Sequence, residues 1–314
     1  MKIICSKSSL LKSVSIALKA VPSKTTMPIL ECILMDATTN QIKFTTNDME
    51  LGIETIVEGI IEEKGKVALD AKIFYEIIRR LPDNDITIKT DDKYAATITC
   101  EKAKFNIPGK SGEDFAYLPM IEKDEPLTIS QYTLKEMIRQ TIFSIAVNEN
   151  NKLMTGELFE IKNNCLKVVS LDGHRISIRK MPLKRNYSDR KIVVPGKTLS
   201  EISKILSGEI DDQVSIYFTK NHMLFEFDQT MVVSRLIEGE YFRIDQMLSS
   251  DYETKLKINK KEFLDCIDRA TLLVREVDKK PIIINITDDD MELRIDSAMG
   301  SMNEEIDIEK EGKD

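Results

Sequence analysis

The sequence has little of what several kinds of protein need. Tryptophan is absent, histidine occurs twice and cysteine five times in 314 residues. The cysteines are odd in number and scattered, with no C-x-x-C pair, which argues against a disulfide framework or a zinc site and favours reduced, mostly buried thiols. No apolar run approaches the roughly 20 residues of a membrane helix, and the first residues do not resemble a secretion signal. We therefore expect a cytoplasmic protein without a membrane partner.

The composition is typical of a folded chain. Hydrophobic residues make up 42% and charged residues 31% of the sequence, far from the composition of disordered chains. At roughly 100 to 200 residues per domain, the length favours two or three domains. The net charge of −8 argues against a nucleic-acid-binding surface that covers the whole protein, but it is compatible with one basic face.

A pattern of strand and helix signals recurs along the chain. Five times a short β-type run leads directly into a stretch with apolar residues three and four positions apart, the spacing of an amphipathic helix. The equivalent positions lie 64, 62, 64 and 65 residues apart. Such regular spacing indicates one structural unit used repeatedly. The positions compared are Ile3, Val67, Ile129, Val193 and Ile258.

Each helical stretch is followed by β-branched or alternating runs separated by polar turns, which predicts about three further strands. The predicted unit is β-α-β-β-β, and the predicted fold class is α+β. Because one unit cannot cover both its sheet and its helix, two units should pair into a domain of two helices packed on antiparallel sheets. Polar segments near residues 122–126 and 249–253 then divide the chain into domains 1–125, 126–250 and 251–314, and the last of these holds a single unit.

The basic residues are concentrated in the helices. Each helical stretch has a net positive charge, although the chain as a whole is acidic. These stretches are residues 6–21, 71–81, 131–146, 196–207 and 260–275. Any single helix of this kind is typical of a solvated surface, but five of the same sign favour a side of the molecule that holds a polyanion through its phosphates. The expected phosphate contacts on the helices include Lys12, Arg79, Arg139 and Lys197.

Two segments look like phosphate loops but lack a required glycine. Residues 108–111 (P-G-K-S) and 195–198 (P-G-K-T) match the end of such a loop. Lys104 and Lys191 stand where the first glycine must lie so that backbone amides can surround a phosphate. The dinucleotide-binding pattern G-x-G-x-x-G is also missing. Nucleotide hydrolysis is therefore not supported, and no cofactor is expected.

The polar cluster Asp172-Gly173-His174-Arg175 is open to two interpretations. It is typical of a tight turn between strands, but Asp172 and His174 could also serve a metal-dependent nucleic-acid enzyme. Catalysis would need further positioned groups, and a metal would need three or four ligands. The second histidine, His222, lies in an alternating run, and the acidic residues 288–290 are interpreted as a hairpin loop rather than a metal site.

Several motifs, taken in order, resemble those of one family. They are residues 10–12 (L-L-K), 27–30 (M-P-I-L), 46–50 (T-N-D-M-E), 143–146 (F-S-I-A), 158–160 (L-F-E) and 171–175 (L-D-G-H-R). Together they resemble the bacterial DNA polymerase III β subunits, the sliding clamps. The resemblance implies six β-α-β-β-β units in three domains, of which five units are found here. It also implies a non-enzymatic DNA replication processivity factor without catalytic residues, metal or cofactor.

The resemblance further implies site residues. The DNA-facing positions of the family correspond to Lys24, Lys72, Asn148, Lys152 and Leu153. Lys24 and Lys72 stand where relatives have arginine, which keeps the charge but removes bidentate phosphate geometry. The pocket for short partner peptides corresponds to Met154, Leu171, Gly173, His174, Arg175, Ile176, Phe242 and Met247, with Phe242 in place of a usual proline.

The implied assembly is a head-to-tail homodimer that closes a ring around duplex DNA, with helices inside and sheets outside. Phe105 and Ile107 of one chain would meet Leu272 and Leu273 of another in a heterologous interface. The expected partners are double-stranded DNA, the DNA polymerase III α subunit, clamp-loader subunits and other proteins with clamp-binding peptides. Because no sixth unit follows before Asp314, a clamp-like scaffold that does not close on DNA is the alternative.

Overall fold

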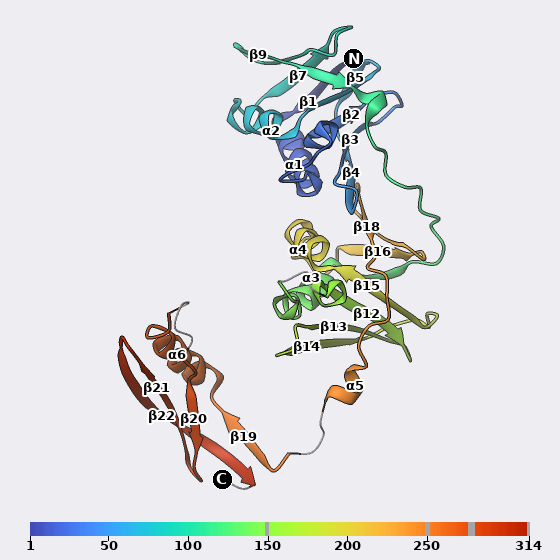
Figure 1. Cartoon of the computed structure of the whole chain (residues 1–314). Coiled ribbons are helices and arrows are strands. Elements are labelled where there is room, and N and C mark those ends of the chain that lie inside the picture. The colour runs from blue at the N-terminus through green and yellow to red at the C-terminus, as the bar shows by residue number, and fades with distance from the viewer. Residues whose placement is uncertain (148–150, 249–251, 276–279, 313–314) are drawn as a thin grey trace. The chain divides into compact units, whose positions relative to one another are not determined.

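The structure is a computed structural model that describes residues 1–147, 151–248, 252–275 and 280–312 (Figure 1). The chain forms two compact units, Met1–Tyr241 and Phe242–Asp314. Each unit contains helices and antiparallel sheets, which confirms the α+β class. A strand runs directly into a helix at each of the five positions that the sequence indicates. These pairs are β1 (Lys2–Ser6) and α1 (Lys7–Ala17), β6 (Lys66–Asp70) and α2 (Ala71–Arg80), β11 (Leu127–Ser130) and α3 (Gln131–Arg139), β15 (Arg190–Pro195) and α4 (Gly196–Ile205), and β19 (Thr254–Ile258) and α6 (Lys260–Thr271).

The last residue of a strand often caps the helix that follows it. The side chains of Ser6, Asp70 and Ser130 each accept a hydrogen bond from the backbone amide three residues later. Such a bond satisfies one of the amides that a helix leaves unpaired at its start. The extended backbone of the strand therefore ends, and the helix begins, at a residue that the sequence specifies.

Three antiparallel sheets make up the first unit. Their orders are β5-β1-β7-β8-β9, β10-β6-β2-β3-β4-β18-β17-β16-β11 and β14-β13-β12-β15. In the long sheet β4 pairs with β18, with Ile53 opposite Val232, so this sheet continues from the N-terminal half of the unit into the second half. The remaining strands are β2 (Cys32–Asp36), β3 (Ile42–Asn47), β4 (Leu51–Val57), β5 (Ile60–Glu63), β7 (Asp85–Thr90), β8 (Ala96–Cys100), β9 (Ala103–Ile107), β10 (Gly109–Ser111), β12 (Gly156–Lys162), β13 (Cys165–Leu171), β14 (Ile176–Pro182), β16 (Gln213–Phe218), β17 (His222–Phe227) and β18 (Thr230–Arg235).

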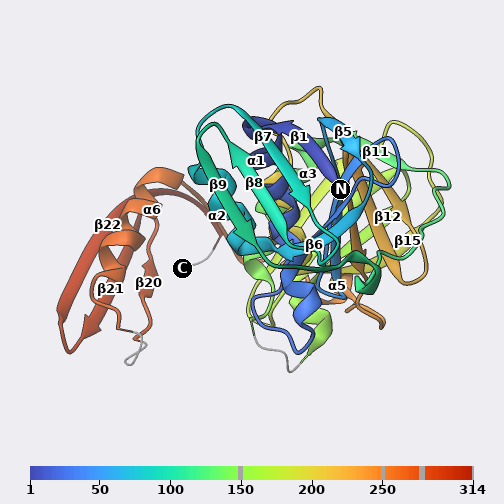
Figure 2. The same cartoon turned by 90° about the horizontal axis from the view of Figure 1, so that it is seen from above.

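Four helices pack in pairs on these sheets, α1 with α2 and α3 with α4. One core lies under α1 and α2, where the rings of Phe44 and Phe74 meet edge to face with 6.1 Å between their centroids. A second core lies under α3 and α4 and includes Phe159 and Phe225. In Figure 1 all four helices lie along one side of the unit, to the left of β3, β4, β16 and β18; Figure 2 turns the same ribbon by 90°.

Some details of the predicted helices are wrong. The helix predicted over residues 131–146 ends at Arg139, and a short 3-10 turn, η4 (Ile142–Ser144), follows it. The buried Thr141 hydroxyl donates to the Met137 carbonyl at 2.8 Å at this point. On α2 the buried face is formed by Phe74 and Ile78, and Ile73 is 52% exposed. The last predicted helix likewise ends at Thr271, before residue 275.

In the second unit α6 lies against the strands of a sheet. Its sheet order is β19-β22-β21-β20, with β20 (Ile283–Ile286), β21 (Asp290–Ser297) and β22 (Gly300–Gly312). Its core joins Cys266 of α6 to Met291, Leu293 and Ile306. The short helix α5 (Ile244–Met247) begins the unit. Among the described residues, no helix has both the length and the apolar character needed to span a membrane.

Candidate nucleic-acid and peptide-binding surfaces

Exposed basic residues lie on or next to the helices of the first unit. Lys12 is on α1, Lys72 on α2, and Lys24 in the loop before the 3-10 turn η2 (Pro28–Glu31), and all three side chains are exposed. None of the three has an ion-pair partner among the described residues. They therefore remain available to phosphate oxygens.

The other predicted cations of the helices are already paired. Arg79 lies 2.7 Å from Glu76 on α2, and Arg139 lies 2.7 Å from Glu136 on α3. In each pair the hydrogen bond from the arginine is the main reason why the pKa of the glutamate lies below its usual value. A bound phosphate would have to compete with these carboxylates, each of which lies three residues away on the same helix.

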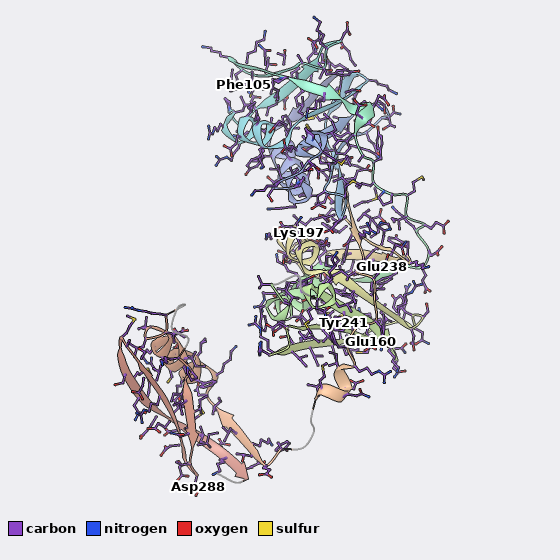
Figure 3. All side chains as sticks on the ribbon, in the orientation of Figure 1. Phe105, Glu160, Lys197, Glu238, Tyr241 and Asp288 are labelled. Atoms are coloured by element: carbon purple, nitrogen blue, oxygen red, sulfur yellow. The ribbon has the colours of Figure 1, made fainter. Side chains whose placement is uncertain are left out.

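Lys197 has a different partner. It is the second residue of α4 (Figure 3), and its Nζ lies 2.5 Å from Oδ2 of Asp48, in the turn before β4. The Asp48 side chain is only 6% exposed, whereas that of Lys197 is 63% exposed. The ion pair joins the two halves of the unit beside the β4–β18 pairing. Lys197, which was predicted to contact DNA, therefore already makes a contact within the protein.

The segment after η4 carries two further predicted residues. Lys152 and Leu153 belong to the short 3-10 helix η5 (Lys152–Thr155). The Leu153 backbone amide donates a hydrogen bond to the side chain of Asn151, which caps this helix. Lys152 is exposed, whereas Leu153 is half-buried beside Gly239. Asn148, the remaining predicted DNA contact, lies outside the described residues.

Residues 172–175 form the tight turn between β13 and β14. Oδ1 of Asp172 accepts the amides of His174 at 3.1 Å and Arg175 at 3.2 Å, and Oδ2 lies 3.0 Å from Nε of Arg175. Gly173 has φ +90°, a backbone conformation that residues other than glycine rarely adopt. The backbone bond from His174, with those from Arg175, lowers the pKa of Asp172. Asp172 is thus a structural acceptor, and His174 is an exposed turn residue.

This turn lies beside an aromatic side chain that was not predicted to belong to the site. The Arg175 guanidinium is 5.8 Å from the centroid of the Phe143 ring, and Phe143 is 57% exposed. The structure therefore brings Arg175 against Phe143. Three residues after Phe143, the Ala146 amide donates to the carbonyl of Met154 at 2.8 Å. The F-S-I-A motif contained Phe143, but its contact with Arg175 depends on where α3 ends. The prediction extended this helix to residue 146, whereas it ends at Arg139.

A buried polar cluster lies below this surface. The Ser144 and Ser177 hydroxyls are 2.6 Å apart, and Ser170 donates to the Thr141 carbonyl at 2.5 Å. Glu157 of β12 is fully buried, and neither of its carboxylate oxygens has a hydrogen-bond partner among the described residues. Burial raises the pKa of Glu157 to about 8, and the nearby Thr141 hydroxyl opposes this only in part. Glu157 is therefore mostly protonated at neutral pH.

The other predicted pocket residues fall in different places. Leu171 is buried at the end of β13, and Ile176 is half-buried at the start of β14. Phe242 and Met247 belong to the second unit, where Phe242 is half-buried and Met247, at the end of α5, is 51% exposed. Their assignment to the peptide pocket stays a prediction.

The predicted assembly residues include one exposed edge. β9 is the outer strand of the five-stranded sheet, and its Phe105 is 40% exposed (Figure 3). Ile107 of the same strand is half-buried. In the second unit, Leu272 is 74% exposed just after α6, and Leu273 is half-buried.

In the part of the chain that the structure describes, no three His, Cys, Asp or Glu side chains are grouped as metal ligands. His222 lies in β17, where burial lowers its pKa, and Asp288 of the 288–290 loop pairs with Lys310 at 3.0 Å. All five thiols are free, and burial raises the pKa of Cys5 to about 12, which leaves it unreactive.

Paired helices on continuous antiparallel sheets, with exposed lysines on and beside the helices, are the architecture of the class of DNA clamps. Family models for the DNA polymerase III beta subunit match residues 1–119 with its N-terminal domain and residues 128–242 with its central domain. A beta sliding clamp of Staphylococcus aureus is 33% identical over 299 residues, which cover 92% of this chain and 79% of that protein. The chain belongs to the beta sliding clamp family, the β subunits of DNA polymerase III.

Solved structures agree with this assignment. The chain matches a DNA polymerase III beta subunit from Eubacterium rectale with a TM-score of 0.98 and 69% identity, over all of this chain and 86% of that one. The sliding clamp of Bacillus subtilis gives a TM-score of 0.95 and 32% identity, over 100% and 85% of the two chains. The protein is therefore a non-catalytic processivity factor of DNA replication, and the enzymatic alternative for Asp172 and His174 is not favoured.

Proposed function

We propose that this processivity factor holds duplex DNA on the side of α1 to α4 and short partner peptides on the surface around the 172–175 turn. The observation that carries the first part is the set of unpaired, exposed lysines on and beside the helices, Lys12, Lys24 and Lys72. Lysines act as point charges toward phosphates, and phosphate contacts carry no sequence information, so they suit a protein that must move along any sequence.

Binding to linear DNA should be weak and strongly dependent on salt. The chain has a net charge of −8, so attraction to DNA depends on the local basic side and not on the whole surface. Each phosphate contact releases counterions, which makes affinity fall as salt rises. A ring that encircles DNA needs no tight contact to stay on it.

The ring itself requires two copies. We propose that the exposed edge of β9, with Phe105 and Ile107, meets Leu272 and Leu273 of a second copy in a head-to-tail homodimer. A heterologous contact of this kind closes when the rotation between copies completes a ring. The domain division at residues 125 and 250 is part of the same proposal.

The peptide surface tethers the partners. We propose that Arg175, Met154 and Phe143 bind short segments of the DNA polymerase III α subunit, of clamp-loader subunits and of other clamp-binding proteins. Leu171, Gly173, His174 and Ile176 would shape the walls of this surface. Tethering raises the effective concentration of a polymerase at the primer end, which is the physical basis of processivity.

A binding measurement tests the peptide surface. Fluorescence anisotropy with a labelled clamp-binding peptide should show weaker binding for Arg175→Ala and Met154→Ala than for the parent protein. Lys180→Ala is the matched control, because Lys180 is exposed on the same β13–β14 hairpin but away from the turn. Equal affinities for all four proteins would contradict the assignment.

A further inference from the structure

In three of the four repeats of the first unit, the first strand is paired along both of its edges. β1 pairs with β7 and β5, and β6 pairs with β2 and β10. β15 pairs with β12, and Val193 forms a bridge to Ile237 on its other side. The second partner always comes from the chain that follows the last strand of a repeat: β5 follows β4, β10 follows β9, and Ile237 follows β18.

β11 is the exception. It pairs only with β16 and forms the end of the nine-stranded sheet. The chain that follows β14 does not return to β11, because the Leu183 amide is bonded instead to the Asn164 carbonyl in the β12–β13 turn, at 2.7 Å. One edge of this strand therefore has no strand beside it in the described structure.

The free edge presents backbone groups outward. The Gln131 amide donates to the Asp212 carbonyl at 2.8 Å, in the same register that places Thr128 opposite Ser215. Hydrogen-bonded and non-hydrogen-bonded residues alternate along an antiparallel pair. Thr128, three residues before Gln131, is therefore a non-hydrogen-bonded residue, and its amide and carbonyl point away from β16.

A groove of about 550 Å³ runs along this edge, and we refer to it as the β11 groove. Its apolar wall consists of Met181, Leu183 and Tyr187, which are half-buried against the core. Lys184 and Arg185 line its rim, are exposed, and have no ion-pair partner among the described residues. Asp211 lies on the lining too, so the charged groups sum to one net positive charge.

We propose that the β11 groove binds an extended acidic peptide of another protein as an added β-strand. Main-chain hydrogen bonds to Thr128 would provide the pairing that the other repeats obtain from their own chain. An apolar side chain of the peptide would contact the apolar wall, and its acidic side chains would face Lys184 and Arg185. The volume lies within the range of built ligand sites.

This site is distinct from the peptide surface at the 172–175 turn. Both lie on β14, which begins at Ile176 beside the turn and ends at Pro182 beside the groove. Six steps along a strand span about 20 Å. One partner could therefore occupy both sites, and the inference does not depend on the function proposed for the turn.

The test uses a fluorescently labelled peptide of seven alternating glutamate and valine residues, and the corresponding lysine and valine peptide, with the intact protein. Thr128→Pro removes the outward amide but no internal hydrogen bond, because this amide points away from β16. Proline is tolerated at such a free strand edge. Thr128→Ala keeps the amide and is the matched control. We expect the acidic peptide to bind the parent, Thr128→Ala and Arg175→Ala proteins alike. Thr128→Pro and the double variant Lys184→Glu/Arg185→Glu should bind it at least tenfold more weakly.

Hydrogen exchange of Thr128 supplies a second measurement. Its amide should exchange fast in the free protein and become protected when the acidic peptide is added. Equal binding by Thr128→Pro and Thr128→Ala, or equal affinity for the lysine peptide, would overturn the proposal. Strong protection of Thr128 without peptide would also overturn it, since residues 184–189 of the same chain would then occupy the edge.

Discussion

Lys197 and Asp48 are 149 residues apart in the sequence, yet their charged groups meet at 2.5 Å. Asp48 also accepts the backbone amides of Glu50 at 3.0 Å and Leu51 at 2.7 Å, which fixes the turn before β4. The pair lies beside the β4–β18 contact that makes one sheet of two halves. Lys197, which its position on a helix predicts to contact DNA, therefore also helps to hold the two halves of the unit together.

Removing this pair should destabilise the first unit. In Lys197→Ala the nearly buried Asp48 carboxylate loses its counter-charge, and hydrogen bonds to charged groups contribute about 1.5 to 3 kcal/mol. We discount this to about 1 kcal/mol because Lys197 itself is 63% exposed. Urea unfolding measures the change. Lys204→Ala, which breaks only the exposed pair with Glu201 on α4, should cost less than about 0.5 kcal/mol.

Glu157 should make stability depend on pH in the unusual direction. Its pKa is about 8 in the folded protein against 4.5 in an exposed glutamate. The folded state therefore binds more protons than the unfolded state between these values, and stability falls as pH rises from about 4.5 to 8. At pH 7 the resulting loss in the free energy of unfolding is on the order of 3 kcal/mol. Glu157→Met should remove this loss, as urea unfolding of both proteins between pH 5 and about 8 would reveal.

Glu160 is the matched control for this prediction. It lies on the same strand, three residues away, but faces Lys167 at 2.6 Å and Lys191 at 2.9 Å. Burial alone would raise its pKa, but the two lysines together lower it. Glu160→Met should therefore destabilise the protein at pH 7, because it removes the carboxylate that both lysines contact. A Glu157→Met variant that is no more stable than the parent at pH 8 would contradict the burial argument.

Periodicity identified each strand-to-helix step and the α+β class, because helix and strand spacings are local properties of sequence. Residue chemistry also identified the 172–175 turn, whose Asp and Gly form it through local bonds. The pairing of Arg79 with Glu76 was not predicted, although their spacing of three residues on a helix favours it. The isolation of Glu157 and the free edge of β11 were not predicted because each depends on which side chains or strands the fold brings together, and neither composition nor spacing encodes that.

Phe143 should contribute to peptide binding with little effect on stability. Its ring is 57% exposed and lies against Arg175, so truncation removes a contact surface and a cation–π pair but little core. Cation–π pairs at exposed sites contribute about 0.5 to 1 kcal/mol, which corresponds to roughly two- to fivefold in affinity. We expect Phe143→Ala to weaken a clamp-binding peptide by about this factor in an anisotropy titration. Val147→Ala, at a 93% exposed position nearby in sequence, should not.

The two edges of the five-stranded sheet should differ in their effect on assembly. Phe105 is 40% exposed on β9, and Ile60 is 63% exposed on β5 at the opposite edge. A charge placed in a dimer contact carries a desolvation cost, so Phe105→Arg should shift the protein toward monomer. Light scattering over a range of concentrations measures this. Ile60→Arg should leave the mass unchanged, and an equal loss of dimer in both variants would speak against β9 as the interface.

DNA binding should separate the free cations from the paired ones. Lys72 and Arg79 are both exposed on α2, but only Arg79 has a carboxylate partner, Glu76 at 2.7 Å. Losing one phosphate contact reduces the slope of log affinity against log salt by about 0.9. Lys72→Ala should show this reduction in duplex titrations between about 50 and 200 mM salt. Arg79→Ala should show a smaller one, because Glu76 already neutralises part of its charge. If Arg79→Ala had the larger effect, DNA would have to displace Glu76, and the paired arginines would be the principal contacts.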